Sequence, residues 1–555
     1  MLTVNSKDLF TSVALRCGVI IYLAIFVRYQ TDPHHDGYIL GSAAAVADGR
    51  FVHTGAFSQY GPVTPWLAGF FLNITSNSVL NLRILSGILA FLTYLLIEHT
   101  LRKLEFSKNL SRLMAISWIA INHVTSTSFD GSFFLWPSLI SSLFLLSSLN
   151  LILIGILKNR NKFIFLLSGS LIGLAFFTRI QSIIVVFVLV ILSWVCIKEI
   201  KDVLIIGSGT LLTTLLILFY LSYVGSLQDF INQVIIWPAS AYPSLGSGNN
   251  YNRFQFVLYV SLPIAFTGYL YIAKMLLAKF KEHKTIAVLL IAIGTYLISY
   301  LGGSLLLSDK NAYLRLIVGD QANRIIFWPI YFCFFGTVVL AILSLLKRFR
   351  RTAVRDLKTV AVIAFGLSVT PQIFPQPDIA HLWWIAPLLI PPTLVLIRSW
   401  GVNLSQLKFP LVSILIASGI ASITYSQRDW SSYTYKPLVG TFAFKKKADA
   451  VNVYKPLTEF LKKNNAVFLC HDGLHAVASG RYASIDEWFV DWGFLQNTDS
   501  ETRLKSTNNI VVCDLERKEL DQINEKYDLE TILFTEDKFG DIYRSLAILS
   551  RNHNE

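Results

Sequence analysis

A train of long apolar runs fills most of this sequence and limits what the chain can fold into. Between residues 1 and 425 the runs are separated only by short polar stretches, and several reach the roughly 18–20 residues needed to cross a bilayer. The 555-residue chain is 54% hydrophobic and 15% charged, whereas soluble proteins carry about 25% charged residues. Helices that are apolar all round cannot all be packed inside a soluble core. We therefore expect residues 1–425 to form an all-α, polytopic membrane domain.

The loops between the runs give the expected orientation of about thirteen transmembrane helices. Lysine and arginine gather in every second loop, as in the segments 102–112, 158–162 and 347–358. By the positive-inside rule these loops are cytoplasmic, which places residues 426–555 outside. The net charge of +13 is thus a feature of membrane topology, and we exclude a nucleic-acid partner. The spans are expected near 9–28, 80–99, 112–127, 134–156, 163–178, 182–198, 203–223, 254–278, 285–307, 325–346, 359–371, 383–398 and 409–425.

Residues 426–555 have the composition of an ordinary soluble protein and predict a small α/β extracytoplasmic domain. Helix-like and strand-like runs alternate along this segment. Cys470 and Cys513 end two of the strand-like runs, and either a disulfide or two buried thiols is compatible with those positions. Helices are expected at Leu457–Lys463 and Glu516–Lys526, and strands at Ala466–Leu469, Ile510–Val512 and Thr531–Phe534.

The long first outer loop, residues 28–79, holds an unusual cluster of ionisable residues. It reads Thr31-Asp32-Pro33-His34-His35-Asp36-Gly37-Tyr38, just past the end of the first span. Such carboxylates can serve general acid–base chemistry, and with the imidazoles they can ligate a metal, although the mixture is not diagnostic. A capped surface turn explains the same residues without chemistry. Short interfacial helices are expected at Gly37–Ala47 and Pro65–Leu72.

A second motif in this loop is Gln59-Tyr60-Gly61-Pro62, followed by Trp66. Aromatic residues beside glycine and proline suit a turn at the membrane interface. An aromatic belt accounts for Trp66, but it gives no reason for Gln59.

Basic residues also occur on the expected outer side, against the positive-inside rule. Ionisable residues at membrane depth indicate function, and guanidinium groups match phosphate oxygens. Each arginine taken singly also fits a snorkelling anchor. His381 lies beside Trp383 and Trp384, which suit either a sugar platform or an aromatic belt. The outer residues in question are Arg179, Arg253, Arg315, Arg324, Asp378 and His381.

The first-loop acidic motif, the Tyr-Gly-Pro motif, the number of spans and the outer α/β tail together resemble the GT-C superfamily of polyprenyl-phosphate-sugar glycosyltransferases. The similarity extends to protein O-mannosyltransferases and the lipid A aminoarabinose transferase family. In that family an Asp of the first outer loop is the base or orients the acceptor. The family motif is often Asp-Glu or Glu-Asp, whereas here it is His35-Asp36-Gly37 with Asp32 upstream. Both carboxylates remain candidates, and Asp36 is favoured because it directly precedes the expected helix.

The resemblance implies a bacterial inner-membrane enzyme that transfers a hexosyl or pentosyl group, with inversion, from a polyprenyl-phosphate carrier to a lipid, glycan or protein acceptor. No cofactor is expected, and a divalent cation is left open. Two alternatives are a lipid-linked saccharide transporter or flippase and a polysaccharide polymerase or ligase. A transporter would place its charges at mid-membrane in repeated halves, whereas here they gather on one side. The implied site has Asp36 and Asp32 as catalytic residues and His35, Gln59, Tyr60, Arg179, Arg253, Arg315, Arg324, Asp378 and His381 as substrate-binding residues.

Overall fold

A computed structural model describes the N-terminal half of the chain and parts of the C-terminal half. The described residues are 6–27, 33–76, 78–125, 133–158, 160–196, 200–239, 357–373 and 379–399, four strands between 467 and 551, and the single positions 275, 294 and 412.

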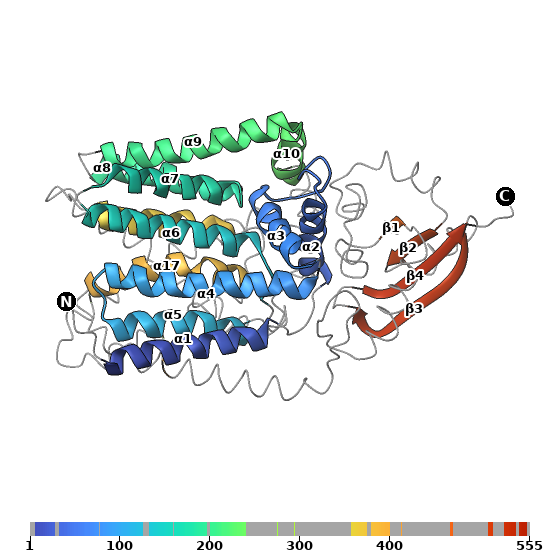
Figure 1. The fold of residues 1–555 in the computed structure, drawn as a ribbon, viewed down its shortest axis with the longest axis horizontal. Coiled ribbons are helices and arrows are strands. Elements are labelled where there is room, and N and C mark those ends of the chain that lie inside the picture. Colours follow the sequence, from blue (N-terminus) through green and yellow to red (C-terminus); the bar gives the residue numbers. More distant parts are fainter. Residues whose placement is uncertain are drawn as a thin grey trace.

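Long helices run side by side and form a bundle (Figure 1). Each lies where a span was predicted, including the short one near 359–371, so these predictions are confirmed as helices. The spans predicted near 254–278, 285–307, 325–346 and 409–425 lie outside the described residues. The bundle helices are α1 (Ser6–Phe26), α4 (Val79–Lys103), α5 (Lys108–Thr125), α6 (Pro137–Leu157), α7 (Lys162–Phe176), α8 (Ile184–Cys196), α9 (Lys201–Tyr223), α16 (Leu357–Ser368) and α17 (Ile379–Ser399).

Local sequence explains where several of these helices begin. Ser78 caps α4 by accepting a hydrogen bond from the Asn81 backbone N–H, and Asn161 caps α7 by accepting from Phe163 and Ile164. α6 begins at Pro137, a position at which the missing proline N–H leaves no helical bond unmade.

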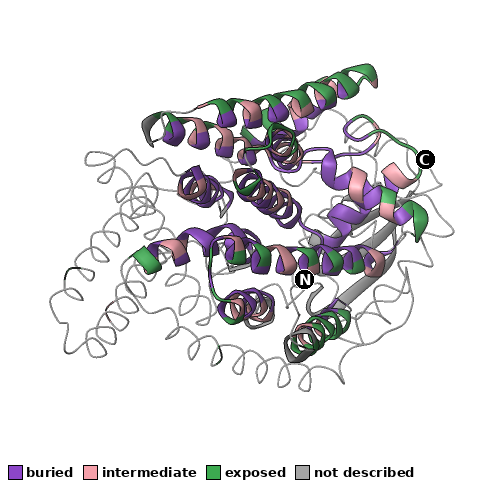
Figure 2. Cartoon of the chain, turned by 60° about the vertical axis from the view of Figure 1, so that its left-hand side comes forward, coloured by how far each residue is buried: buried purple, intermediate pink, exposed green. Residues whose placement is uncertain are grey.

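Length and apolar character make four of the described helices able to cross a membrane, namely α4, α6, α9 and residues 381–399 of α17. Only 28% of the apolar window of α9 is buried, and Figure 2 shows exposed residues along its outer side. Phe219 on α9 is 73% exposed. Apolar side chains on the outside of a bundle are expected where the surrounding solvent is lipid, so the chain is a multi-helix membrane protein.

A reciprocal contact between two tryptophans joins α5 to α17 inside the bundle. The Trp118 indole donates to the Trp383 carbonyl at 2.8 Å, and the Trp383 indole donates to the Trp118 carbonyl at 2.7 Å. The two rings are stacked with centroids 4.7 Å apart. Both indole N–H groups are therefore satisfied, as a buried polar group requires.

Short helices gather at one end of the bundle, on the right in Figure 1. Both short helices predicted in the first loop are present, although each begins four or fewer residues earlier than predicted, at Pro33 and Val63 (roughly one helical turn). The helices at this end include α2 (Pro33–Ala47), α3 (Val63–Ile74) and α10 (Leu227–Ile231). Three single turns follow α7, α10 and α16 in the chain, namely the 3₁₀ turn η1 (Ile180–Ile183), the π-helical turn η2 (Asn232–Ile236) and the 3₁₀ turn η3 (Thr370–Ile373).

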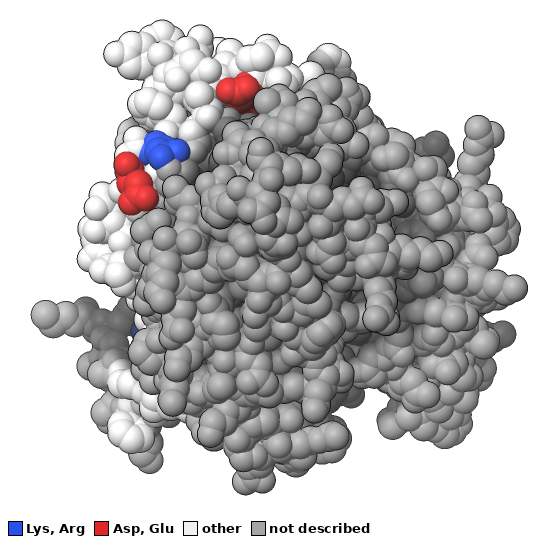
Figure 3. All heavy atoms as spheres, turned by 90° about the vertical axis from the view of Figure 1, so that its right-hand side faces the viewer, with Lys and Arg blue, Asp and Glu red and all other residues white. Residues whose placement is uncertain are grey.

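The opposite end of the bundle carries the basic loops. Lys358 donates to the Glu105 carboxylate at 2.9 Å, and Arg398 donates to the Leu104 carbonyl at 2.9 Å. The α2–α3 end faces the viewer in Figure 3, where a few charged side chains of described residues are visible. Within the described helices, the basic loops therefore share one end, as the predicted topology requires.

The C-terminal strands form one sheet in the order β1-β2-β4-β3, at the same end as α2 and α3 in Figure 1. β1 (Val467–Leu469) pairs parallel with β2 (Asn509–Cys513). β3 (Tyr527–Phe539) and β4 (Tyr543–Arg551) form an antiparallel hairpin, and β4 also pairs with β2. Three strands were predicted and β4 was missed, because a short apolar run such as Leu546–Leu549 has no period that separates strand from helix. The two helices predicted in this segment lie outside the described residues.

Candidate functional site

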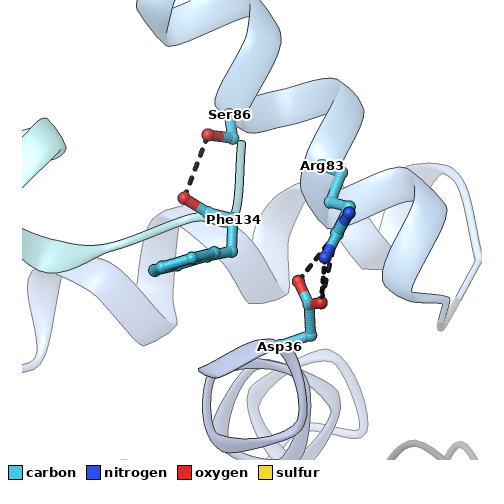
Figure 4. A network of polar contacts seen from close by, with 4 residues as sticks. All are labelled: Asp36, Arg83, Ser86 and Phe134. Atoms are coloured by element: carbon cyan, nitrogen blue, oxygen red, sulfur yellow. Dashed lines mark hydrogen bonds and ion pairs between the residues drawn. The ribbon is translucent and has the colours of Figure 1, made fainter. Parts of the chain in front are cut away.

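A buried ion pair joins the first outer loop to the bundle (Figure 4). The Arg83 Nε donates to both carboxylate oxygens of Asp36, at 3.0 and 3.1 Å, and Nη2 donates to Oδ2 at 2.5 Å. The two side chains are only 1–2% exposed. A guanidinium that contacts both oxygens fixes the orientation of the carboxylate as well as its charge.

The two partners come from different helices and lie near the α2–α3 end of the bundle. Asp36 lies in the first turn of α2, and Arg83 lies near the start of α4. One turn beyond Arg83, the Ser86 hydroxyl donates to the Phe134 carbonyl at 3.2 Å (Figure 4). The segment that leads into α6 is thereby held against the same face of α4.

The ion pair refines what the sequence predicted for Asp36. The helix begins at Pro33, so Asp36 is inside its first turn and does not precede it. Arg83 was not predicted as a site residue. Its signal was in the sequence, because a lone arginine inside an apolar span is expected to face a partner within the protein.

An aromatic cluster extends from α2 to α17. Tyr38 meets Tyr60 edge to face with ring centroids 6.1 Å apart, and Tyr60 meets Trp136 at 5.4 Å. Trp136 stacks on Trp384 at 5.7 Å, and the His381 ring lies edge-on to Trp384 at 4.9 Å. The predicted residues Tyr60 and His381 are thus members of one continuous cluster, and His381 is 8% exposed.

The Tyr-Gly-Pro motif docks the first loop on the end of α7. A Cβ at Gly61 would lie 1.8 Å from the Phe177 carbonyl oxygen, so only glycine allows this approach. The Val63 N–H then donates to that same carbonyl at 3.2 Å. The neighbouring Gln59 is held as well, because its backbone N–H donates to the Tyr38 hydroxyl at 2.5 Å.

A buried polar cluster surrounds Arg179, two residues after Phe177. Arg179 is 4% exposed; its Nη1 donates to the Ser138 hydroxyl and its Nη2 to the Gln372 carbonyl, the latter at 2.9 Å. The Gln372 side chain donates to Ser182 at 3.1 Å, and Ser182 shares a hydrogen bond with Ser141 at 2.6 Å. The start of α6 and the segments that follow α7 and α16 therefore converge on this arginine.

The structure places some of the predicted site residues and leaves others outside the described part. Asp36, Gln59, Tyr60, Arg179 and His381 all lie toward the α2–α3 end of the bundle, which is the end predicted to be outside. His35 is in the first turn of α2, but its side chain is outside the described part. Asp32, Arg253, Arg315, Arg324 and Asp378 fall outside the described residues.

No group of three or more potential metal ligands occurs among the residues that the structure describes. The side chains of Asp32, His34 and His35 are not among them, so the divalent cation left open from the sequence stays untested.

No protein-family model matches the chain, and no curated protein matches its sequence. Solved structures do resemble it. One is the oligosaccharyltransferase of Archaeoglobus fulgidus in complex with Zn and sulfate, with a TM-score of 0.47 and 13% identity over 90% of this chain and 68% of that one. Another is ArnT from Cupriavidus metallidurans bound to undecaprenyl phosphate, with a TM-score of 0.44 and 11% identity over 99% of both chains. Both are GT-C glycosyltransferases.

The oligosaccharyltransferase has also been solved with an inhibitory peptide and a dolichol-phosphate, at a TM-score of 0.46 and 12% identity over 90% of this chain and 69% of that one. At these identities and TM-scores the likeness assigns no role to any residue of this chain.

Proposed function

We propose that this chain is a GT-C-type glycosyltransferase that moves a sugar from a polyprenyl-phosphate carrier to an acceptor on the non-cytoplasmic face. The observation that carries the proposal is the buried Asp36–Arg83 pair at the outer end of the bundle. Burying two charges is weak evidence for stability, because desolvation offsets most of their attraction. Ionisable residues at membrane depth are costly to maintain, which favours a functional reason for them.

The proposed reaction assigns Asp36 to the acceptor. The acceptor hydroxyl oxygen bonds to the anomeric carbon as the bond from that carbon to the carrier phosphate breaks, and attack from the opposite side inverts the configuration. A carboxylate offers about four lone-pair sites, so Asp36 can hold Arg83 and still accept or orient the acceptor proton. Arg83 fixes the orientation of the Asp36 carboxylate. Asp32 remains the second candidate for this role.

The carrier phosphate is assigned to the outer arginines. The departing phosphate gains negative charge, which a preorganised guanidinium stabilises. Arg179 fits this role because it is buried and held by polar groups at two helix ends, Ser138 of α6 and the Gln372 carbonyl beyond α16. Arg253, Arg315 and Arg324 are proposed to line the same cavity. Tyr60, His381 and the intervening tryptophans form an aromatic surface suited to a sugar face, with His35, Gln59 and Asp378 as further polar contacts.

The wider organisation completes the proposal. About thirteen spans make up residues 1–425, and residues 426–555 form a separate α/β domain on the non-cytoplasmic side. The sheet described between residues 467 and 551 supports that second domain. We place the protein in a bacterial inner membrane, with a hexosyl or pentosyl donor.

The test is binding and release of the carrier by the full-length protein in lipid nanodiscs. Native mass spectrometry should show that the protein retains undecaprenyl phosphate in preference to undecaprenol. Membranes of the source organism should yield free polyprenyl phosphate when they are incubated with the protein. Arg179→Lys keeps the charge but loses the planar fork, so binding should weaken by about tenfold or more. Arg160→Lys is the matched control, because Arg160 is half-exposed at the other end of the bundle.

Equal retention of undecaprenol and undecaprenyl phosphate would contradict phosphate recognition. Movement of lipid-linked sugar across vesicles without release of polyprenyl phosphate would favour the flippase alternative.

A further inference from the structure

A second buried hydrogen-bonded contact ties the first outer loop to the segment that follows α9. The Gln233 Nε2 donates to the His53 carbonyl at 2.7 Å, and the Ser58 backbone N–H donates to Gln233 Oε1 at 3.1 Å. The His53 Nδ1 lies 2.9 Å from the same Oε1. His53 is fully buried, and Gln233 is 2% exposed. One side-chain amide therefore binds three groups of a loop that is 180 residues away in sequence.

The backbone partners determine the protonation of the imidazole. They fix Oε1 of Gln233 as an acceptor and Nε2 as a donor, so Nδ1 of His53 must carry the hydrogen that it shares with Oε1. Nε2 of the neutral ring is then a lone-pair acceptor, and this buried atom has no hydrogen-bond partner among the described residues. Burial, partly offset by the Gln233 hydrogen bond, lowers the pKa of His53 to about 4. The ring is thus a neutral donor at physiological pH.

His53 and Gln233 both have backbone conformations that residues rarely adopt. His53 has a φ of 74°, in the left-handed region that few residues other than glycine adopt. Gln233 lies in the π-helical turn η2, and single π turns are rare and often occur at functional sites. Such conformations persist where the surrounding structure fixes them.

The same two segments meet at further points. The Thr54 hydroxyl shares a hydrogen bond of 2.6 Å with that of Ser226. The Phe57 ring stacks on Trp237 at 6.3 Å with an interplanar angle of 3°. Beyond Phe57 the loop reaches Gln59, whose N–H binds the Tyr38 hydroxyl, and Tyr38 is two residues from Asp36 on α2.

We propose that the His53–Gln233 contact positions the first outer loop for sugar transfer, so that His53 and Gln233 are positioning residues for Asp36. The inference rests on the proposed function. The path runs from Gln233 through residues 53–58 to Gln59 and Tyr38, and so to the helix that carries Asp36. A displacement of about 1 Å in a reacting group can cost about a hundredfold in rate.

The first arm of the test measures the contact without using activity. Gln233→Met keeps the side-chain length and removes all three hydrogen bonds, and Gln228→Met makes the same change at an exposed position on α10. Hydrogen-exchange mass spectrometry of the full-length protein in nanodiscs should show faster exchange over residues 53–63 in Gln233→Met only.

The second arm measures release of polyprenyl phosphate from membranes of the source organism. We expect Gln233→Met to slow release by roughly ten- to a hundredfold for equal amounts of folded protein, with unchanged retention of undecaprenyl phosphate. Gln228→Met should match the wild type. His53→Asn should recover most of the rate and the exchange protection that His53→Gly loses. Both residues tolerate a positive φ, and only asparagine supplies an N–H where Nδ1 lies.

Three results would overturn the inference. Faster exchange in Gln233→Met with a wild-type rate of release would leave the contact without a positioning role. A rate that falls only in proportion to the folded fraction would make the contact purely structural. No release by the wild type would remove the proposed function, and the positioning role with it, although the exchange result would still report the contact.

Discussion

The guanidinium of Arg83 holds both carboxylate oxygens of Asp36 with contacts of 2.5–3.1 Å, and both side chains are 1–2% exposed. This single pair connects the first interfacial helix, α2, to the long helix α4. Removal of either partner therefore has two consequences, one for the charge balance of the interior and one for the proposed chemistry. The variants Asp36→Asn and Arg83→Gln distinguish these two consequences.

Asp36→Asn should abolish most of the transfer while the protein remains inserted in the membrane. Asparagine keeps the size of the side chain and can accept from Arg83, but it cannot take a proton from the acceptor. General-base help is typically worth about 10²–10⁴ in rate. We therefore expect release of polyprenyl phosphate to be slower by at least about a hundredfold. The measurement is release from membranes of the source organism by equal amounts of folded protein.

Asp48→Asn is the matched control, since Asp48 is an exposed carboxylate just past the end of α2. Asp32→Asn tests the alternative base. Near wild-type release by Asp36→Asn, together with loss in Asp32→Asn, would reassign the role to Asp32. Activity in both variants would rule out a catalytic first loop.

Arg83→Gln should be less stable than the double variant with Asp36→Asn. The single change leaves a buried carboxylate without its cation, and breaking a buried pair in this way typically costs about 3–5 kcal/mol. The double variant removes both charges and should recover most of that loss, yet it should remain inactive. Denaturant unfolding in detergent micelles checks stability, and the release assay checks activity. Equal unfolding free energies of the single and double variants would show that the charges of Asp36 and Arg83 do not stabilise each other.

The sequence predicted the helices better than the site. Apolar length alone located the bundle helices, because a membrane span must satisfy its backbone internally and a helix does so without partners. The short helices of the first loop were also predicted, although α2 begins at Pro33. Strand β4 was missed, because its short apolar run Leu546–Leu549 has no period that separates strand from helix.

The contacts within the site needed the structure. Asp36 was predicted from its position in the motif, whereas its partner Arg83 lies 47 residues away. Nothing in the local pattern at His53 or Gln233 indicated that the two residues meet. Such pairings depend on how α2, α4 and η2 are placed against one another, and sequence periodicity gives only the face of each helix.

Gly61→Ala should displace the first loop from the end of α7. The new Cβ would lie 1.8 Å from the Phe177 carbonyl oxygen and 2.4 Å from its carbon, and backbone atoms cannot move independently to make room. Overpacking of this kind typically costs about 1–3 kcal/mol. Faster amide exchange at Val63, which donates to the same carbonyl, should accompany a lower unfolding free energy.

Gly207→Ala in α9 is the control for this change, because a Cβ there meets no atom within 4 Å. It should stabilise the helix by about 0.5–1 kcal/mol. A Gly61→Ala protein with wild-type stability and Val63 exchange would show that the loop does not require this close approach.

Acid should loosen the His53–Gln233 contact. Burial lowers the pKa of His53 from 6.5 to about 4, and the Gln233 hydrogen bond offsets only part of that shift. Above pH 6.5 the imidazole is neutral whether the loop is closed or open, so the contact has its full stability. As the pH falls from 6.5 to about 4, the open loop takes up a proton that the closed loop excludes. The closed state then loses about 1.4 kcal/mol for each pH unit, or on the order of 3 kcal/mol across the window.

Below pH 4 both states are protonated and the loss should stop growing. Hydrogen exchange over residues 53–63, corrected for the intrinsic pH dependence of amide exchange, measures this loss. His53→Asn carries no titratable group at the position, so its protection should stay constant over the same window. If the wild type shows the flat profile of His53→Asn, the imidazole is not held neutral by burial. The closed loop would then already accommodate the charged ring, with Nδ1–H still donating to Gln233 Oε1 and the added proton on Nε2.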